Sequence, residues 1–456
     1  MQHGLRVSLL SLRDLFLTAA PFVLLAAALV ALAYWLLDPT PPKQVVLATG
    51  QDQGAYAEFG KRYAQLLKAN GIEVRLKKTA GAAENIALLK EPGGDVDIAF
   101  VQGGADENAP TTATDEGDLP DDGLVSLGSL FYEPVWIFYR VEAAQRLRKE
   151  DTLTSLTQLP GWRVNIGAPG SGVPNLMARL LEANRIDPAT ITLVREPSTP
   201  AVVGLLDGSI DAIVFASAPE SLLVQMLLQT PGIALFDFAQ SEAYARRFPF
   251  LSAVTLPRGV VDLARDIPPS DVRLVAPTAT LVARKNTHPA LIQLFVQAAQ
   301  QVHGGAGWFQ KKGDFPNPRN TERPLAREAQ RFYTSGPPVL QRYLPFWLAN
   351  LVDRMWPVLV TILAALLPLS RMLPPLYTFR VRSRIFRWYR QLREVESAIG
   401  RRPNEELLRD LEEIERRVEH VHVPLSYTEE LYALRAHIHM VAERLVAPLP
   451  AGTVPA

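Results

Sequence analysis

The hydropathy of the chain is organised around two apolar stretches that bracket about 300 residues of mixed polarity. The first runs from Leu15 to Leu37, 23 residues without a charge, and the second from about Met355 to Leu369. A helix that crosses a bilayer needs roughly 20 apolar residues, so the first stretch is long enough to span. The second is short, and a short span is matched by local thinning of the bilayer. The pattern predicts two membrane anchors.

Charges beside the two stretches predict their orientation. Arg6 and Arg13 precede the first stretch, and no acidic residue follows the second until Glu394. The second stretch is followed instead by Arg371, Arg380, Arg382, Arg384, Arg387, Arg390 and Arg393. Basic segments beside a span tend to remain in the cytoplasm. Both termini are therefore expected in the cytoplasm and the central residues outside it. The arginines would also attract anionic membrane lipid.

Each stretch has an alternative interpretation. A cleavable signal peptide also begins with an apolar helix, and Ala31-Leu32-Ala33 resembles a cleavage site. The apolar run exceeds the roughly 7–15 residues of a signal-peptide core, which favours an uncleaved anchor. The second stretch could be a buried helix of a soluble domain. We interpret residues 343–373 as an amphipathic interfacial helix, up to Arg354, that leads into a short span.

Strand-like and helix-like patterns alternate between the two stretches. Short β-branched or apolar runs predict strands at 44–49, 73–77, 96–101, 163–166, 192–195 and 212–215. Helical spacing predicts helices at 56–69, 83–89, 172–184 and 201–207. Such alternation is typical of an α/β fold with mostly parallel sheets.

The composition changes after the second stretch, where residues 380–447 are rich in Arg, Glu and Leu. We expect two or three cytoplasmic helices here. Leu407, Leu408, Leu411, Ile414 and Val418 form one apolar stripe at helical spacing. Such a stripe indicates packing of helix on helix, either within one chain or in a homodimer.

The overall composition excludes several classes of site. The chain has 47 basic and 47 acidic residues, so nothing indicates a nucleic-acid partner, and it has no cysteine for disulfides or thiolate chemistry. Residues 106–122 hold seven acidic residues. We interpret this segment as a solvated loop, because its spacing differs from that of an EF-hand. No metal and no cofactor is predicted.

Three glycine turns, each followed by a predicted helix, are candidates for ligand binding. They lie at 49–56 (TGQDQGAY), 79–85 (TAGAAEN) and 167–172 (GAPGSG). Glycine permits close approach of a ligand to the backbone, and unpaired N–H groups at a helix N-terminus favour anions. Two groups of such turns, separated by about 80 residues, predict two lobes with a ligand cleft between them.

These segments resemble the TAXI-type solute-binding proteins of tripartite ATP-independent periplasmic (TRAP) transporters. The resemblance rests on T-G-x-x-x-G-x-Y at 49–56, T-x-G-x-x-E-N at 79–85, D-x-A-F-V-Q at 97–102, G-x-P-G-S-G at 167–172 and D-G-x-I-D-A at 207–212. The order and spacing together are specific, whereas each motif alone is not. The resemblance covers roughly residues 44–330.

The resemblance implies a two-lobed, type II periplasmic-binding-protein-like fold that captures a small organic acid, glutamate-like or a dicarboxylate, for TRAP permease subunits. The ligand contacts it implies are Gly50, Gly54, Tyr56, Gly81, Asn85, Gln102, Ser171, Gly172 and Phe215. Arg195 is a further candidate, because a guanidinium binds a carboxylate in bidentate fashion.

The expected segments follow from these observations. They are a cytoplasmic N-terminus at 1–14, an anchor at 15–37, a Pro-rich spacer at 38–43, the two-lobed domain at 44–340, the helices of 343–373, a cytoplasmic helical region at 374–447 and a disordered tail at 448–456. Lobe 1 is expected at 44–135 and 255–330, and lobe 2 at 136–254.

The two spans depart from a solute-binding protein that is free in the periplasm. They leave a second hypothesis open, a transmembrane ligand sensor or scaffold whose cytoplasmic helices engage a partner. An enzyme is not expected, because Ser171 does not lie in a G-x-S-x-G nucleophile motif and no sequence pattern ties a histidine to it.

Overall fold

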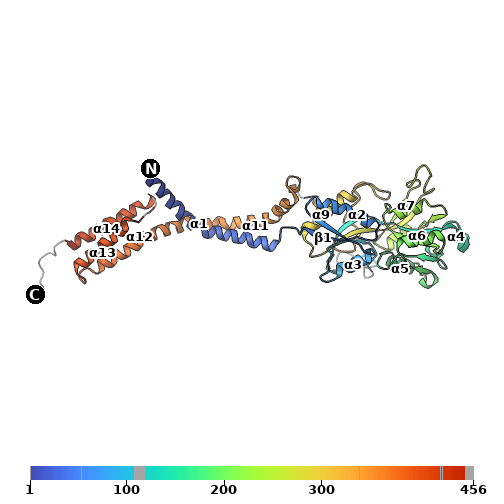
Figure 1. Cartoon of the computed structure of the whole chain (residues 1–456), viewed down its shortest axis with the longest axis horizontal. Coiled ribbons are helices and arrows are strands. Elements are labelled where there is room, and N and C mark those ends of the chain that lie inside the picture. Colours follow the sequence, from blue (N-terminus) through green and yellow to red (C-terminus); the bar gives the residue numbers. More distant parts are fainter. Residues whose placement is uncertain are drawn as a thin grey trace. The chain divides into compact units, whose positions relative to one another are not determined.

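The computed structural model describes residues 2–52, 54–106, 119–337, 339–421, 423 and 425–446. These residues form two compact units (Figure 1). The sheet unit comprises Thr40–Asn350, and the helical unit comprises the residues up to Pro39 and those from Leu351 onward. Most of the predicted acidic loop at 106–122, and the predicted tail at 448–456, lie outside the described residues.

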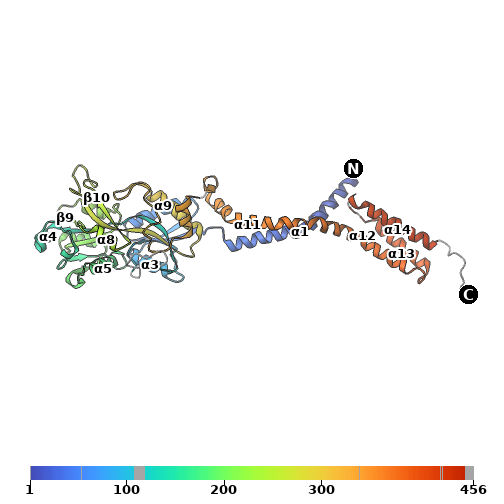
Figure 2. The ribbon, with the colours of Figure 1, turned by 180° about the vertical axis from the view of Figure 1, so that it is seen from behind.

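The first sheet of the sheet unit has the strand order β10-β11-β3-β1-β2, and β4 also pairs with β11. Its strands are β1 (Gln44–Ala48), β2 (Glu73–Lys77), β3 (Ile98–Gln102), β4 (Leu124–Tyr132), β10 (Leu251–Leu256) and β11 (Val272–Arg284). Strand β1 is parallel to β2 and β3, whereas β11 runs antiparallel to β3, β4 and β10. From behind, β10 is seen beside a short helix, α8 (Ser241–Arg247) (Figure 2).

The second sheet has the order β7-β6-β8-β5-β9. Its strands are β5 (Val135–Arg140), β6 (Arg163–Asn165), β7 (Thr192–Val194), β8 (Ala212–Ala216) and β9 (Ile233–Leu235). Strand β6 is parallel to β7 and β8, but β5 is antiparallel to β8 and β9. The predicted α/β class is therefore confirmed, and the prediction of mostly parallel sheets is wrong because antiparallel strands run through both sheets.

Helices pack around each sheet. Those in contact with the first sheet or its neighbours are α2 (Ala55–Lys68), α3 (Ala82–Lys90), α9 (Pro289–His303) and α10 (Arg327–Ser335). Those associated with the second sheet are α4 (Val141–Arg148), α5 (Val173–Ala183), α6 (Ser198–Asp207) and α7 (Leu222–Leu228). Helices α2, α3, α5 and α6 match predicted helices to within a few residues.

Two hydrophobic cores define two lobes, and β10 of the first sheet packs in the second core. Leu47, Phe100 and Phe295 lie in the first core, and Trp136 and Trp162 lie in the second. The chain passes between the lobes at the link from β4 to β5. Strand β11 also extends across both, since Val272–Ala276 pack in the second core and Ala279–Ala283 in the first. A backbone hydrogen bond of 2.8 Å from Glu133 N to Pro277 O joins these two crossing segments.

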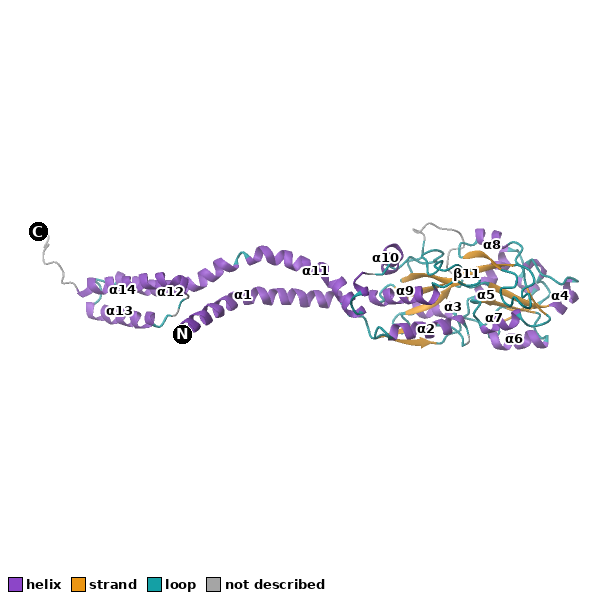
Figure 3. Ribbon diagram, turned by 90° about the horizontal axis from the view of Figure 1, so that it is seen from above, coloured by secondary structure: helices purple, strands orange, loops and turns teal. Residues whose placement is uncertain are grey.

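The described residues of the helical unit contain helices and no strand (Figure 3). The helices are α1 (Gln2–Leu37), α11 (Phe346–Ser370), which begins in the sheet unit, α12 (Leu373–Ser397), α13 (Asn404–Glu419) and α14 (Thr428–Val446). The segments Phe16–Leu37 and Phe346–Ser370 are long and apolar enough to cross a membrane, and 6% of each apolar window is buried. A core helix of a soluble domain would be mostly buried, so this exposure disfavours that alternative for the second stretch.

Helices α12, α13 and α14 form a bundle around the apolar stripe of α13. Leu407, Leu411, Ile414 and Val418 are buried against residues of α12 and α14 such as Ile385, Leu434 and Ile438. The stripe is thus covered within one chain. It offers no argument for a homodimer.

Candidate functional site

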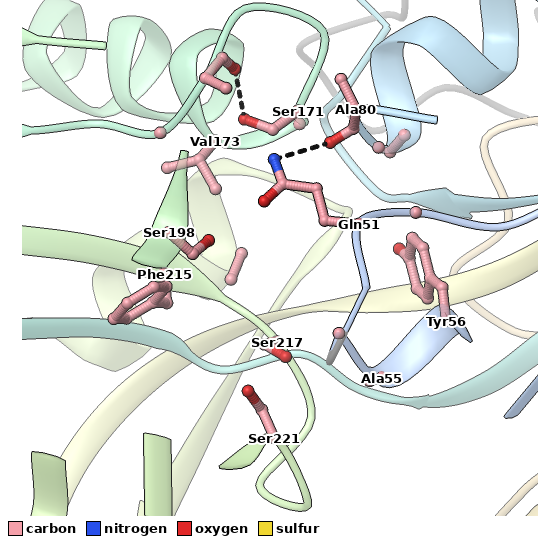
Figure 4. Close-up of a pocket in the computed structure, with 18 of the residues that line it drawn as sticks. Gln51, Ala55, Tyr56, Ala80, Ser171, Val173, Ser198, Phe215, Ser217 and Ser221 are labelled. Atoms are coloured by element: carbon pink, nitrogen blue, oxygen red, sulfur yellow. Dashed lines mark hydrogen bonds between the residues drawn. The ribbon is translucent and has the colours of Figure 1, made fainter. Parts of the chain in front are cut away.

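A cavity of about 130 Å³ lies between the two lobes of the sheet unit. Both lobes contribute to its wall: Gln51, Tyr56 and Ala80 come from the first, and Ser171, Ser198 and Phe215 from the second (Figure 4). The volume is close to the ~150 Å³ of a protein cavity that accommodates benzene. In this arrangement of the lobes, the space suits a small molecule.

Four helices begin at this cavity. The residues that precede their first turns are Gly54 for α2, Gly81 for α3, Gly172 for α5 and Pro197 for α6, and the cavity wall contains the first or neighbouring residue of each helix. The first N–H groups of a helix have no partner within the helix, and the helix dipole favours negative charge there. The sequence-predicted turns at 49–56, 79–85 and 167–172 supply three of these four termini.

Two glycines allow the lobes to approach each other closely. A Cβ atom on Gly172 would lie 2.8 Å from Gln102 Oε1, and one on Gly81 would lie 3.1 Å from Ser171 Cα. Gly81 also has a φ of 143°, which L side chains rarely adopt. A backbone hydrogen bond from Glu84 N to Gly170 O, 3.0 Å long, crosses between the lobes at the same place.

Most of the sequence-predicted ligand contacts lie on the cavity wall. These are Gly50, Gly54, Tyr56, Gly81, Gln102, Ser171, Gly172 and Phe215. Phe215 also belongs to the second hydrophobic core and is 8% exposed. Its side chain therefore packs in the core of the lobe and also forms part of the cavity wall. Arg195 is exposed and does not line the cavity, so the proposed guanidinium partner for a carboxylate is not in place.

Asn85 does not line the cavity, in contrast to the prediction. It is fully buried, and its amide nitrogen donates to Thr49 O at 2.6 Å and Phe100 O at 2.8 Å. Its amide oxygen accepts from Thr79 Oγ1 at 2.7 Å. Asn85 therefore joins the residue that follows β1 and the middle of β3 to the turn that carries Gly81. It supports the cavity wall and does not line it.

Ser171 lines the cavity, but its donors are already used. Its backbone N–H and its hydroxyl both donate to Ala168 O, at 3.1 and 2.7 Å. The hydroxyl retains only acceptor capacity for a ligand in this arrangement. In this geometry Ser171 has no free hydroxyl hydrogen to donate to a ligand carboxylate.

Gln102, the last residue of β3, offers a donor without a partner. The side chain is 3% exposed, and its Nε2 has no hydrogen-bond partner among the described residues. A buried donor left unpaired costs about 1–3 kcal/mol. Because Gln102 lines the cavity, an acceptor on a ligand that reached Nε2 would remove that cost.

Tyr56 and Glu133 form a buried pair at the cavity. The Tyr56 hydroxyl donates to Glu133 Oε2 at 2.8 Å, and its ring stacks on Phe100 at a centroid distance of 5.1 Å. Burial raises the pKa of Glu133 to about 8, although the hydrogen bond from Tyr56 acts in the opposite direction. Burial, with the Glu133 carboxylate close by, also raises the pKa of Tyr56 well above its ordinary value. Both groups are mainly protonated at neutral pH.

The sequence reasoning did not identify Glu133, although a signal was present. It is the one charged residue between Leu124 and Tyr139, in the middle of a long apolar run. A lone carboxyl group in such a run is either exposed at a turn or buried at a cost in free energy, and a costly burial indicates a functional role. Asn165, Ser198 and Ser217 also line the cavity without having been predicted, and they carry no distinctive motif.

Charged groups are rare on the cavity wall. Among the described residues that line it, the ionisable acids are Asp52 and Glu133, and there is no lysine, arginine or histidine. Asp52 is exposed and paired with Lys78. No group of three or more potential metal ligands occurs among the described residues. An anion bound here would rely on helix termini and neutral donors rather than on a cation.

A second cavity, of about 840 Å³, lies on α12 and α14 of the helical unit. Its floor includes the buried Ile385, Leu392 and Val441. Its rim carries the exposed Phe386 and Met440 together with Arg382, Arg390, Arg393 and Arg444. Glu396 and Glu430 also line the groove, and Glu430 is paired with Arg382 at 2.9 Å. The groove is therefore apolar at its centre, with more arginines than acidic residues at its edges.

Comparison with known proteins identifies the family. The sequence model of the NMT1-like family matches residues 47–301, and no curated protein matches the chain. A solved structure from Bordetella bronchiseptica RB50 is 16% identical, covers 57% of this chain and 71% of that one, and has a TM-score of 0.37.

Two alkanesulfonate-binding proteins are among the other similar structures. SsuA from Xanthomonas axonopodis pv. citri is 13% identical over 57% of this chain and 73% of its own, with a TM-score of 0.36. The periplasmic SsuA from Escherichia coli is 14% identical over 71% and 83%, with a TM-score of 0.33. Scores this low carry no argument about function. The family match spans 255 of the 456 residues and includes almost all of both sheets. The chain therefore belongs to the NMT1-like family.

Proposed function

We propose that the chain is a membrane-anchored, extracytoplasmic solute-binding protein that captures a small organic acid for a TRAP-type secondary transporter. The observation that carries the proposal is the cavity between the lobes, where four helix N-termini converge with the unpaired amide donor of Gln102. A concave site between lobes with a few convergent polar groups is the usual form of a small-molecule site.

The anion preference follows from the wall of the cavity. Helix N-termini bind carboxylates without a cationic side chain, and Gln102 adds a neutral donor to them. Two cores, joined where β4 leads to β5 and where β11 crosses, support a type II periplasmic-binding-protein fold whose lobes close over the ligand. Ligand-dependent closure of this kind is a hinge motion about the crossing segments.

The transport assignment rests on the TAXI-like motifs and on the two apolar helices. In this proposal α1 and α11 anchor the chain in the inner membrane, the sheet unit lies in the periplasm, and both termini lie in the cytoplasm. Permease subunits would receive the ligand. A catalytic role is not part of the proposal, because Ser171 Oγ is bonded to a carbonyl oxygen and not to a base.

The proposal is tested on the full chain in lipid nanodiscs. Native mass spectrometry detects a co-purified small acid, and melting curves are recorded with a panel of mono- and dicarboxylates with and without amino groups. A ligand at 100 times its Kd adds about 2.7 kcal/mol of stability. A protein that carries no small acid and does not respond to any panel member contradicts the proposal.

A second candidate function is a ligand sensor whose cytoplasmic helices bind an acidic, amphipathic helix of a partner protein. The observation that favours it is the groove on α12 and α14, with its apolar floor and arginine rim. Arg390→Glu with Arg393→Glu would reverse the charge of the rim, and Arg409→Glu on the exposed side of α13 is the control. Solute uptake that is unaffected by the rim variant while the protein remains in the membrane favours the sensor. Loss of uptake favours a tail that couples to the transporter.

A further inference from the structure

Glu133 occupies a special position that the anion site does not explain. It lies between β4 and β5, where the chain crosses from one lobe to the other, and its side chain lines the cavity. It is 2% exposed, and its backbone N–H is bonded to Pro277 O on the second crossing strand, β11. A carboxyl group is thus fixed to the two segments about which the lobes would close.

No cation that could compensate this carboxyl group lies on the described part of the cavity wall. Tyr56 of α2 donates one hydrogen bond to Oε2. Among the described residues of the wall, the other ionisable group is Asp52, in the loop before α2, which is itself acidic. The neighbouring wall residues of β3 and β8, such as Gln102 and Phe215, are neutral. A buried carboxylate is costly without a cation, so the empty cavity holds Glu133 in its protonated form.

We propose that Glu133 selects a ligand with a protonated nitrogen, and that binding of this ligand releases the proton that Glu133 holds in the empty cavity. The inference rests on the proposed solute-binding function and narrows its ligand class. The ligand carboxylate faces the helix termini, and its ammonium group faces Glu133. The proton leaves Glu133 for solvent, the ammonium remains protonated, and a buried ion pair replaces a neutral carboxyl group.

A dicarboxylate would meet a different situation at Glu133. Two carboxylates in a buried site cannot both remain ionised at low cost. Glu133 would therefore keep its proton and could donate its O–H to the ligand, while its Oε2 accepts from Tyr56. A dicarboxylate would bind without proton release, so of the two ligand types that the sequence suggested, only the amine-bearing one forms an ion pair with Glu133.

The test compares pairs of compounds that differ by one amino group. The probes are L-glutamate with glutarate, L-leucine with 4-methylpentanoate, and γ-aminobutyrate with butyrate, each titrated calorimetrically into the full chain in nanodiscs. Titration at pH 7 in buffers of different ionisation enthalpy measures proton release. We expect amine-bearing probes to bind with release of close to one proton. Their affinity should therefore increase as the pH is raised, by up to about tenfold per pH unit, until the pH reaches about 8.

Glu133→Gln keeps the shape and the acceptor for Tyr56 but cannot ionise. It should weaken binding of the amine-bearing probe by at least about tenfold and abolish proton release. Glu322→Gln is the matched control, since burial also raises the pKa of Glu322, which accepts from Gly104 N and does not line the cavity. This control should leave both readouts unchanged.

The outcomes separate this inference from the proposed function. If an acid without nitrogen binds the wild-type chain as tightly as its amine-bearing partner, with no proton release, the role of Glu133 is overturned and solute binding stands. If no probe of either kind binds, the proposed capture of small organic acids fails together with the inference. The measurement of proton release uses the wild-type chain, so it does not depend on how well the variant folds.

Discussion

At the scale of single residues, the cavity separates groups that serve the fold from groups that serve a ligand. Asn85 and Gln102 are both buried amides in the first lobe, and the sequence motifs place both in one ligand-binding set. The structure distinguishes them by their partners. The amide of Asn85 is bonded at both its nitrogen and its oxygen, whereas Gln102 has an unpaired nitrogen. Motifs identify the residue type, and only three-dimensional packing decides which amide is free.

Gln102→Met should therefore raise stability and lower ligand affinity. Removing the unpaired Nε2 relieves a desolvation cost of about 1–3 kcal/mol in the empty protein. The bound state loses a hydrogen bond to a charged group, worth about 1.5–3 kcal/mol. Melting of the empty chain and calorimetric titration with the ligand that the nanodisc panel identifies check the two effects.

Asn85→Leu is the contrasting variant. It leaves Thr49 O, Phe100 O and the Thr79 hydroxyl without their partner, so it should destabilise the empty chain by about 3 kcal/mol or more. An opposite pattern, in which Gln102→Met destabilises the empty protein and Asn85→Leu does not, would show that these assignments are reversed.

His303 gives the sheet unit a predictable sensitivity to acid. Its ring packs against Phe59, Tyr63 and Phe131, and burial lowers its pKa to about 3, with a smaller contribution from Arg62. Because the unfolded chain binds the proton near pH 6.5, this neutral histidine contributes stability above that value, which is lost as pH falls towards 3. Wild-type protein should lose stability between pH 6.5 and pH 4 more steeply than His303→Leu, as measured by melting at each pH. Parallel curves for the two proteins would contradict the burial argument.

At the scale of elements, the sequence predicts the repeating part of the fold well and the crossing part poorly. Alternating periodicity predicts the elements in which a strand is followed by a turn and an amphipathic helix. These are strands β1, β2, β3, β6, β7 and β8 and helices α2, α3, α5 and α6. Strands β4, β5 and β11 are long apolar runs without such punctuation. Periodicity alone assigns no partner or direction to such runs. The expected lobe boundary at 135/136 lies beside the link from β4 to β5, but the crossing strands themselves and Glu133 were not identified for that reason.

The close approach of α5 to β3 leads to a prediction about closure. Gly172 has an ordinary φ of −72°, so alanine is tolerated by the backbone, but its Cβ would meet Gln102 Oε1 at 2.8 Å and Ala105 Cβ at 3.1 Å. Gly172→Ala should hold the lobes apart and weaken ligand binding by about 1–3 kcal/mol, the cost of overpacking. Calorimetric titration measures this loss of affinity.

Gly305→Ala is the matched control, since a Cβ there would meet nothing within 4 Å. Small-angle scattering with and without ligand adds a second readout, because the Gly172 variant should fail to compact when ligand is added. If both alanine variants bind the ligand with wild-type affinity and become as compact as the wild type when it is added, close contact between Gly172 and Gln102 is not needed for ligand binding.

At the scale of the whole molecule, the two units have separate hydrophobic cores. The sheet unit contains the two cores of its lobes, and the core of α12, α13 and α14 belongs to the helical unit. Compact units with their own cores unfold as separate cooperative transitions unless an interface couples them. This arrangement bears on the choice between a transporter component and a sensor, because a sensor requires that ligand binding in one unit changes the energy of the other.

The full chain in nanodiscs should therefore show two unfolding transitions in calorimetry. Leu411→Ala removes a side chain that is 2% exposed in the bundle and should lower one transition only, by about 2–5 kcal/mol. A bound ligand should raise only the other, by about 2.7 kcal/mol at 100 times its Kd. If ligand also shifts the transition that Leu411→Ala lowers, the units are energetically coupled and the sensor hypothesis gains. If each perturbation stays in its own transition, ligand binding in the sheet unit does not change the energy of the helical unit, and the sensor hypothesis fails.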